Sequence, residues 1–345
     1  MITELGSPQQ VFTLEVRLTT KCNYNCYYCT DLHNNKNPIT LLSSTNVCLL
    51  IQSITKIIKL PIHLFIYGGE PTIYPHIDGF INDILEYITI NKLSVFVELQ
   101  TNLSRDSKWI TSFCERYKIY NEIFSVSCSF HNTESKILSF VKKCLILKKY
   151  NLLHKVTFMY NKREYVMPDF NTGISILGTK YCEVSPLIDS KTSQVVSDVT
   201  ELQHIQSREK IDKLAEHSFF FKKNIECKDD QKGEHYTSRF ELWLHNKNTF
   251  HGYACRVAME RLVIDWDGNC YKCFNEMFAD VPPVFNINAI VDYDEYFSNV
   301  KIVVCPFAKC FFDLEHKKTK QLAGIESIPI TVNAIYGTNS YRKKN

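Results

Sequence analysis

Three cysteines near the N-terminus, Cys22, Cys26 and Cys29, have a spacing that suits iron-sulfur chemistry. They form the pattern C-x3-C-x2-C. A [4Fe-4S] cluster usually takes four thiolates, so a loop that supplies three leaves one iron with an open position for a substrate or cofactor. A zinc loop and three unrelated core cysteines are the alternatives, but zinc sites mostly combine a C-x2-C pair with a second pair or with histidines. The spacing favours a cluster with one open corner.

A second group of cysteines follows residue 250, around a segment that predicts a hairpin. Asp267-Gly268 is a turn signal between two short strands within residues 261–273. Cysteines on and beside a tight hairpin can converge on one metal, and a small zinc-ribbon-like module is the alternative to an iron-sulfur cluster. The cysteines of this group are Cys255, Cys270, Cys273, Cys305 and Cys310.

The elements that must position these residues follow from the apolar pattern. Between about residues 12 and 190, short apolar runs alternate with longer helical stretches, which indicates an α/β fold with a parallel sheet. Six strands are expected, at 11–18, 62–67, 94–100, 123–129, 155–160 and 181–187. Helices are expected from Ser44, the predicted N-cap, to about 58, and near 76–91, 105–118, 132–150 and 164–177. Six β/α units are too few to close an eight-unit barrel.

Polar residues at the ends of these strands are candidates for binding ligands. A Gly-Gly-Glu run follows the second strand, where glycines let the backbone approach a ligand and a carboxylate can accept from a positively charged amino group. Glu98 shares strand parity with Gln100 and is expected to point into the barrel, while His131 follows the fourth strand. Both are candidates for binding substrate or moving a proton. The alternatives are a buried, hydrogen-bonded group or a surface residue for these two, and a strand-end hydrogen bond to backbone for Gln100.

Together these motifs resemble the radical SAM superfamily with a C-terminal twitch or SPASM-like auxiliary cluster domain. The resemblance covers about residues 12–188 and 251–313. It rests on the cysteine loop with Tyr28 before its third cysteine, on the runs that resemble the GGE, QTN and VSxD motifs, and on Cys255-x12-Gly268-x4-Cys273. It implies a partial (β/α)6 TIM-like barrel followed by a small cysteine-rich α+β domain. The expected segments are the barrel core at 1–190, a bridge at 191–250 with a helix around 200–224, the auxiliary domain at 251–316 and a tail at 317–345.

The resemblance also implies cofactors and their ligands: two [4Fe-4S] clusters and S-adenosylmethionine (SAM). Cys22, Cys26 and Cys29 would hold the first cluster. Cys255, Cys273, Cys305 and Cys310 would hold the auxiliary cluster, and the spacing does not decide whether Cys270 takes the place of Cys273. Ser129 stands where many relatives have Asp, which leaves its role open. The expected SAM contacts are Tyr28, Gly68, Gly69, Glu70, Gln100, Asn102, Ser127 and Leu187.

The implied activity is reductive cleavage of SAM to a 5′-deoxyadenosyl radical that takes a hydrogen atom from a peptide or natural product. The auxiliary cluster would transfer electrons, and a reduced flavodoxin- or ferredoxin-type protein would be the donor. Because the first barrel strand begins by about residue 12, we expect no N-terminal peptide-recognition domain. A small metabolite or carbohydrate substrate, a non-catalytic iron-sulfur electron carrier and a zinc-binding module are the alternative functions.

The remaining cysteines fall into two groups. Cys48, Cys114 and Cys144 lie in predicted helices and are interpreted as small core residues. Cys128, Cys182 and Cys227 are candidates for reaching the cavity, where one could give a hydrogen atom to a substrate radical.

Composition excludes several other classes. The net charge is only +3, so nothing marks a nucleic-acid binder. With 14 cysteines, no signal peptide and no apolar run of membrane-spanning length, the chain does not read as a secreted disulfide scaffold. We expect a cytoplasmic protein that contacts neither nucleic acid nor membrane.

Overall fold

The computed structural model describes eleven stretches of the chain. They are residues 2–4, 11–29, 41–160, 163–187, 227–229, 234–236, 254–255, 257–279, 281–301, 303–307 and 320–321. The predicted helix around 200–224, Cys310 and most of the predicted bridge and tail lie outside the described residues.

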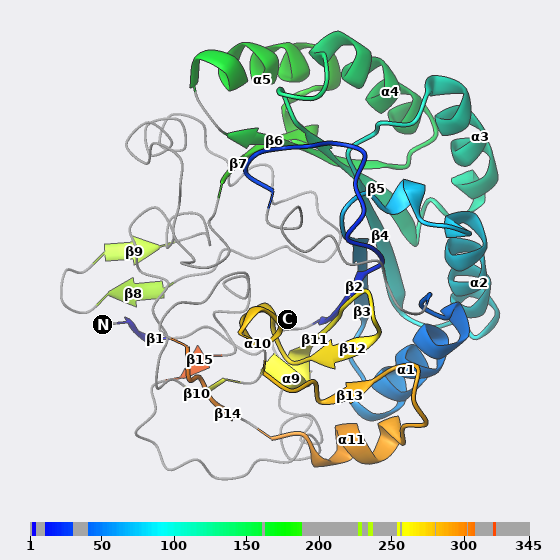
Figure 1. The fold of residues 1–345 in the computed structure, drawn as a ribbon, viewed down its shortest axis with the longest axis vertical. Coiled ribbons are helices and arrows are strands. Elements are labelled where there is room, and N and C mark those ends of the chain that lie inside the picture. The colour runs from blue at the N-terminus through cyan, green and yellow to red at the C-terminus, as the bar shows by residue number, and fades with distance from the viewer. Residues whose placement is uncertain are drawn as a thin grey trace, which may run out of the picture.

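A curved parallel sheet forms the centre of the fold, and helices cover its outer side (Figure 1). Six parallel strands follow in chain order: β2 (Phe12–Arg17), β3 (Ile62–Tyr67), β4 (Val95–Thr101), β5 (Phe124–Phe130), β6 (Leu153–Tyr160) and β7 (Cys182–Pro186). The helices between them are α1 (Ser44–Ile57), α2 (Ile77–Ile90), α3 (Ser107–Tyr117), α4 (Ile137–Lys149) and α5 (Arg163–Leu177). The α/β partial barrel predicted from the sequence is confirmed.

Two helix starts differ from the prediction. The N-cap of α1 is Ser43, whose side chain accepts from the backbone N–H of Asn46, so the expected cap at Ser44 is wrong by one residue. Helix α4 begins five residues later than predicted. The carbonyl of His131 accepts from the backbone N–H groups of both Glu134 and Ser135, which closes a turn before the helix can start.

The two faces of the sheet differ in polarity because side chains alternate along each strand. Toward the helices, residues such as Leu14, Leu64 and Val97 are fully buried in one hydrophobic core. The opposite face is the inside of the barrel and carries polar groups. Its buried members include Thr13, Glu15, Arg17, His63, Glu98, Ser125, Ser127 and Ser129.

The C-terminal hairpin extends the barrel sheet, which the sequence did not predict. Strand β11 (Arg261–Ile264) pairs in parallel with β2, and β12 (Asn269–Tyr271) and β13 (Phe285–Asn286) follow in antiparallel order. The predicted turn is confirmed: Gly268 has a φ of 84°, a conformation that favours glycine. Helix α11 (Tyr293–Asn299) packs beside α1, and the ring centroids of Phe297 and Phe12 lie 6.0 Å apart.

The smaller elements complete the described chain. Single turns of 3-10 helix are η2 (Pro71–Ile73), η3 (Lys118–Tyr120) and η4 (Thr179–Tyr181). Short helices are α9 (Val257–Glu260) and α10 (Phe274–Phe278). The remaining short strands form two small sheets, one of β1 (Ile2–Glu4), β8 (Cys227–Asp229) and β9 (Glu234–Tyr236), the other of β10 (Ala254–Cys255), β14 (Val303–Val304) and β15 (Lys320–Gln321).

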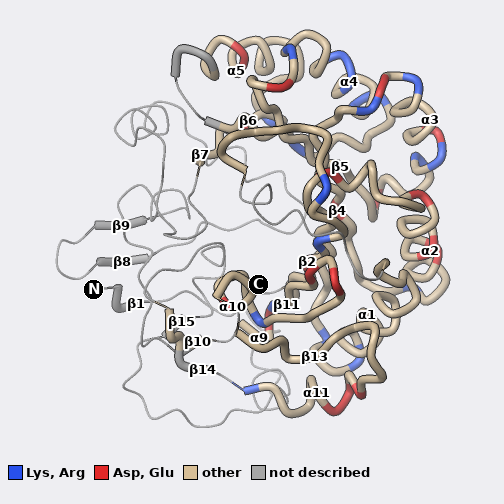
Figure 2. Tube along the Cα trace, viewed as in Figure 1, with Lys and Arg blue, Asp and Glu red and all other residues tan. Residues whose placement is uncertain are grey.

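Charged residues of both signs are interspersed over the outer helices (Figure 2). This distribution agrees with the small net charge of +3. Within the described residues, the helices are too short or too polar to cross a membrane.

Candidate functional site

The three-cysteine loop leaves β2 and runs alongside the loop that follows β3. Backbone hydrogen bonds join the two loops, from Gly69 N to Thr19 O at 2.6 Å and from Glu70 N to Lys21 O at 2.8 Å. A Cβ on Gly69 would lie 2.1 Å from the carbonyl oxygen of Lys21. A Cβ on Gly68, whose φ is +146°, would lie 2.5 Å from that of Thr19. The glycine pair is therefore needed for close contact with the cysteine loop, whatever it also does toward a ligand.

Glu70 is fully buried and satisfied by the protein itself. Its Oε1 accepts from the backbone N–H and hydroxyl of Thr72 and from the hydroxyl of Thr101, and its Oε2 accepts from the backbone N–H of Asn102 at 2.7 Å. Burial raises the pKa of this carboxyl, and the hydrogen bonds oppose that rise. Glu70 thus ties the end of β3 to the end of β4. Its predicted contact with the SAM ammonium stays a prediction.

The cysteines of the loop lie at different depths. Cys26 is 4% exposed, while Cys22 and Cys29 are half-buried. Burial raises the pKa of the Cys26 thiol to about 12, so a bound cation is what would make it a thiolate at neutral pH. Among the described residues, no three His, Cys, Asp or Glu side chains converge on a point that one metal ion could occupy. A cubane cluster, whose irons sit at separate corners, holds its thiolates further apart than one ion does.

His131 and Tyr28 meet at Cys26. The His131 Nδ1 atom lies 3.5 Å from Cys26 Sγ and 3.0 Å from the Tyr28 hydroxyl, and the two rings stack with an interplanar angle of 14°. Burial lowers the pKa of His131 to about 4, so the ring is neutral near pH 7. His131 therefore contacts the cysteine loop, and Tyr28, a predicted SAM contact, has a protein partner of its own.

Asn102 contacts Cys22, as His131 contacts Cys26. Its side-chain amide approaches Cys22 Sγ at 3.7 Å and Asn23 Oδ1 at 3.3 Å, while its own Oδ1 accepts from the backbone N–H of Ser104. Residues at the ends of β4 and β5 thus contact the first two cysteines of the loop.

The other predicted contacts on β4 and β5 lie inside the barrel. Gln100 donates to the Ser129 hydroxyl at 2.8 Å, a side-chain partner that differs from the backbone partner considered as the alternative, and its predicted contact with SAM stays a prediction. Ser127 donates to Glu98, which also meets His63 Nε2 at 2.9 Å. Glu98 points into the barrel, as predicted. Burial alone would raise the pKa of Glu98, but the hydrogen bond from His63 and nearby positive groups hold it well below its usual range.

Sequence reasoning missed several charged residues of the barrel interior. Arg261 of β11 pairs with Glu15 of β2, and both are buried. Arg17, two residues further along β2, lies over the rings of Tyr67, Trp266 and Phe278. The alternation of Thr13, Glu15 and Arg17 with apolar residues was the available signal, since it marks a strand with one polar face.

Two of the cysteines predicted to reach the cavity do not do so. Cys128 and Cys182 are each 1% exposed and belong to the hydrophobic core between sheet and helices. A Cβ placed on Gly173 of α5 would lie 3.5 Å from Cys182 Sγ, which shows the side that Cys182 faces. Cys48, Cys114 and Cys144 are buried in helices, as predicted. The side chain of Cys227 lies outside the described residues, and Leu187 is buried directly after β7.

Three cysteines of the second group gather in one place. Cys255, Cys273 and Cys305 are buried in a single apolar cluster with Val257. Strands β10 and β14 bring two of them together, because Cys255 pairs with Val303, two residues before Cys305. Cys270 lies elsewhere, in the main core beneath α11. Burial raises the pKa values of Tyr293 and Tyr296 of that helix, and the nearby Cys270 raises them further. Of the predicted auxiliary ligands, the structure brings these three together and separates Cys270 from them.

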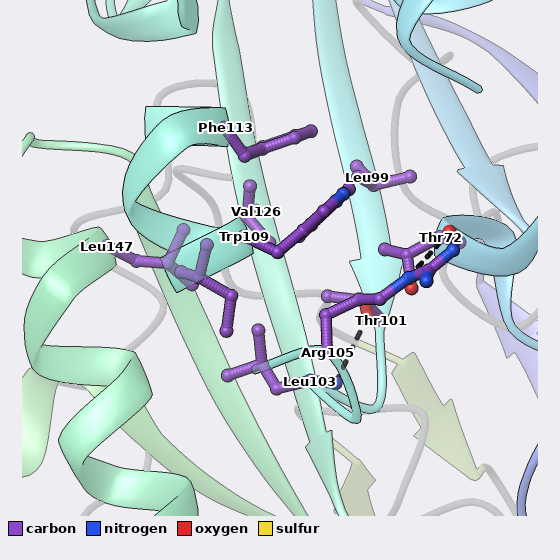
Figure 3. A pocket seen from close by; sticks show the side chains of 10 residues that line it. Thr72, Leu99, Thr101, Leu103, Arg105, Trp109, Phe113, Val126 and Leu147 are labelled. Atoms are coloured by element: carbon purple, nitrogen blue, oxygen red, sulfur yellow. Dashed lines mark hydrogen bonds between the residues drawn. The ribbon is translucent and has the colours of Figure 1, made fainter. Parts of the chain in front are cut away.

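A small hollow lies on the helix side of the sheet, between β4, β5 and α3 (Figure 3). Leu99, Phe113 and Trp109 are among its mostly apolar lining. Its single charged side chain, Arg105, donates to the carbonyl of Thr72 and stacks on Trp109. This lining suits neither the ammonium nor the sulfonium of SAM, and the hollow lies on the helix side of the sheet rather than in the barrel interior.

Several solved structures have a fold similar to that of this chain. The chain matches anSMEcpe with bound AdoMet and the Cp18Cys peptide at 14% identity and a TM-score of 0.50, over 93% of each chain. It matches Streptococcus suis SuiB bound to S-adenosylmethionine (14%, TM-score 0.54) and SuiB bound to the precursor peptide SuiA (12%, TM-score 0.55), over 83% of this chain and about 65% and 64% of SuiB. These proteins are radical SAM enzymes.

The chain has the radical SAM fold. No protein-family model and no curated protein matches its sequence. At identities of 12–14% the likeness concerns the fold. In β/α barrels the active site lies at the carboxyl ends of the parallel strands, and here those ends carry the three-cysteine loop, Glu70, Asn102 and His131.

Proposed function

We propose that this chain is a radical SAM enzyme that modifies a peptide or another natural product. The observation that carries the proposal is the placement of the three-cysteine loop at the carboxyl edge of a parallel barrel sheet. There it pairs with residues 69–70 and meets Asn102 and His131. Three thiols on one loop fit a [4Fe-4S] cluster that has one open iron. The residues around the loop already have hydrogen-bond partners in the protein.

The surroundings of the loop suggest separate roles for the cofactors and for the side chains of the protein. A cluster and SAM bound there would supply a reducing electron and a 5′-deoxyadenosyl radical able to take a hydrogen atom, a reaction beyond the acid/base side chains of a protein. The chain's own residues hold the thiolates, keep the loop against β3 and β4, and line the interior with polar groups that orient the bound molecules. A reduced flavodoxin- or ferredoxin-type protein is the proposed electron donor.

The first test separates this function from a zinc module or an inert cluster. After anaerobic reconstitution with iron and sulfide, the protein should hold about eight irons if both clusters assemble, and should form 5′-deoxyadenosine from SAM when reduced. Cys26→Ala should lose that activity and about four irons. Cys48→Ala, which removes a buried thiol from α1, should keep both. SAM cleavage that continues in Cys26→Ala would show that the first site is misassigned.

We also propose an auxiliary cluster on Cys255, Cys273, Cys305 and Cys310. The clustering of three of these thiols supports it, and Cys270 is left out because it lies under α11. Four protein thiolates would leave no open iron, which favours electron transfer as its role. Cys273→Ala should lose about four irons, whereas Cys270→Ala should lose none. The reverse result would overturn this choice of ligands.

A peptide is the proposed substrate class. The support is that two enzymes of similar fold were solved with peptides bound, Cp18Cys in anSMEcpe and SuiA in SuiB. The test is whether candidate precursor peptides raise the rate of SAM cleavage and change in mass. Stimulation by small metabolites or carbohydrates instead would replace the peptide with that second class.

A further inference from the structure

We propose that His131 is a positioning residue for the first cluster: its Nδ1–H donates a hydrogen bond to the sulfur of Cys26 and makes the cluster easier to reduce. This inference rests on the proposed function, because it takes Cys26 as an iron ligand.

The backbone and ring of His131 are held in place from both sides. Its carbonyl accepts from Glu134 and Ser135 in the turn that precedes α4. Its ring stacks on Tyr28, with ring centroids 6.0 Å apart, and Nδ1 lies 3.0 Å from the Tyr28 hydroxyl and 3.5 Å from Cys26 Sγ, so a proton on Nδ1 is shared between these two acceptors. The distance to Sγ is within hydrogen-bonding range for a sulfur acceptor.

Iron ligation decides which way this hydrogen bond runs. A thiol can donate to a bare Nδ1, but an iron-bound thiolate carries no proton and can only accept. A bare Nδ1 lone pair facing that negative sulfur would be repulsive. The tautomer that bears its proton on Nδ1 is therefore the one compatible with a ligated Cys26. With the proton on Nδ1, the Tyr28 oxygen 3.0 Å away accepts from it, and the Tyr28 hydroxyl proton is left to point to the Cys26 sulfur as a second donor.

Donors aimed at a ligand sulfur change the ease of reduction. Reduction adds negative charge to the cluster and its sulfurs, so a hydrogen bond to sulfur stabilises the reduced form more than the oxidised form. Such bonds are a recognised control of iron-sulfur potentials. Removing the Nδ1 donor should therefore lower the reduction potential.

The experiment compares His131→Phe with His131→Asn in the reconstituted enzyme. Phenylalanine keeps a ring against Tyr28 but has no donor, whereas the asparagine amide nitrogen stands close to where Nδ1 stood. The matched control is His154→Phe, which removes an imidazole of β6 that lies near Glu98 of β4. Each variant is titrated anaerobically against a series of potentials, and the reduced cluster is followed by electron paramagnetic resonance. The first cluster is identified as the signal that changes when SAM is added, since it has the open iron.

We expect His131→Phe to lower the ratio of reduced to oxidised first cluster roughly tenfold at a fixed potential, which corresponds to about 59 mV for a one-electron couple. His131→Asn should recover most of that loss, and His154→Phe should match the parent. An unchanged potential in His131→Phe would overturn the inference while leaving SAM cleavage, and so the proposed function, intact. Absence of a SAM-responsive signal in the parent enzyme would instead remove the proposed function.

A second measurement needs no substitution. In parent enzyme labelled with ¹⁵N-histidine, the reduced first cluster should show a hyperfine coupling to nitrogen transmitted through the hydrogen bond. If His131→Phe fails to assemble a cluster, this coupling still shows whether a histidine donates a hydrogen bond to the cluster. Its absence would show that no histidine donates to the cluster and would overturn the inference.

Discussion

Replacing Gly69 with alanine should loosen the cysteine loop before any ligand is involved. The added Cβ would lie 2.1 Å from the carbonyl oxygen and 2.5 Å from the carbonyl carbon of Lys21, both of them backbone atoms. The loops must then separate, which breaks the hydrogen bonds from Gly69 N to Thr19 O and from Glu70 N to Lys21 O. Each bond contributes about 1 kcal/mol.

The total cost can be worked from these contacts. Two lost hydrogen bonds amount to about 2 kcal/mol, and overpacking strain adds about 1–3 kcal/mol. We therefore expect Gly69→Ala to lose about 3–5 kcal/mol of unfolding free energy. Urea unfolding of the metal-free protein measures this loss, and iron and sulfide content after reconstitution in the absence of SAM measures the effect on the cluster site.

Gly79→Ala is the matched control for this substitution. Gly79 is exposed in α2, and a Cβ there would meet nothing within 4 Å. Alanine should stabilise that helix by about 0.5–1 kcal/mol. Parental stability and full iron content in Gly69→Ala would refute the close pairing of the two loops. Loss of SAM binding alone, with stability unchanged, would point to a direct role of Gly69 toward the ligand.

Three further outcomes are expected. Glu70→Gln turns an amide N–H toward donors such as Thr101, so it should cost about 1–3 kcal/mol in urea unfolding, whereas a stability equal to the parent's would contradict the bonding assigned to Glu70. Glu98 has a folded pKa below its unfolded value of about 4.3. Its pairing with His63 therefore stabilises the fold above that pH and loses this effect as the pH falls through the folded pKa. Glu98→Gln should cost about 3 kcal/mol at pH 7 and progressively less in unfolding series below about pH 4, and a pH-independent difference would refute the assignment. Cys182→Ala should leave 5′-deoxyadenosine formation unchanged and cost about 1 kcal/mol, and a loss of activity without a loss of stability would restore it as a catalytic candidate.

Much of the barrel could be predicted from local patterns. Each strand core was predicted to within a residue or two, because buried parallel strands carry apolar runs separated by helices long enough to show their own period. The parity of Glu98 with Gln100 placed Glu98 inside the barrel. The start of α4 could not be predicted, because it depends on the carbonyl of His131 capturing two N–H groups, which the apolar pattern does not record.

The site was predicted less completely because its contacts join distant parts of the chain. The pairing of Arg261 with Glu15 spans 246 positions and depends on β11 pairing with β2. The contact of Gly69 with the backbone of Lys21 was not predicted, because it joins two loops that are distant in the sequence, and the predicted contact of Gly69 with SAM stays a prediction. Spacing could not separate Cys270 from Cys273, because that choice depends on which side of β12 faces the helices.

The parallel pairing of β11 with β2 has a consequence for how the chain matures during synthesis. The strand that leads into the three-cysteine loop has β3 on one side from early on, but its other side gains a neighbour only when residues 261–264 have been made. Until then no strand among the described residues pairs with that edge of β2, and an unpaired edge is prone to association with other chains. A protein cut short before residue 261 should therefore aggregate through the strand that precedes the three-cysteine loop.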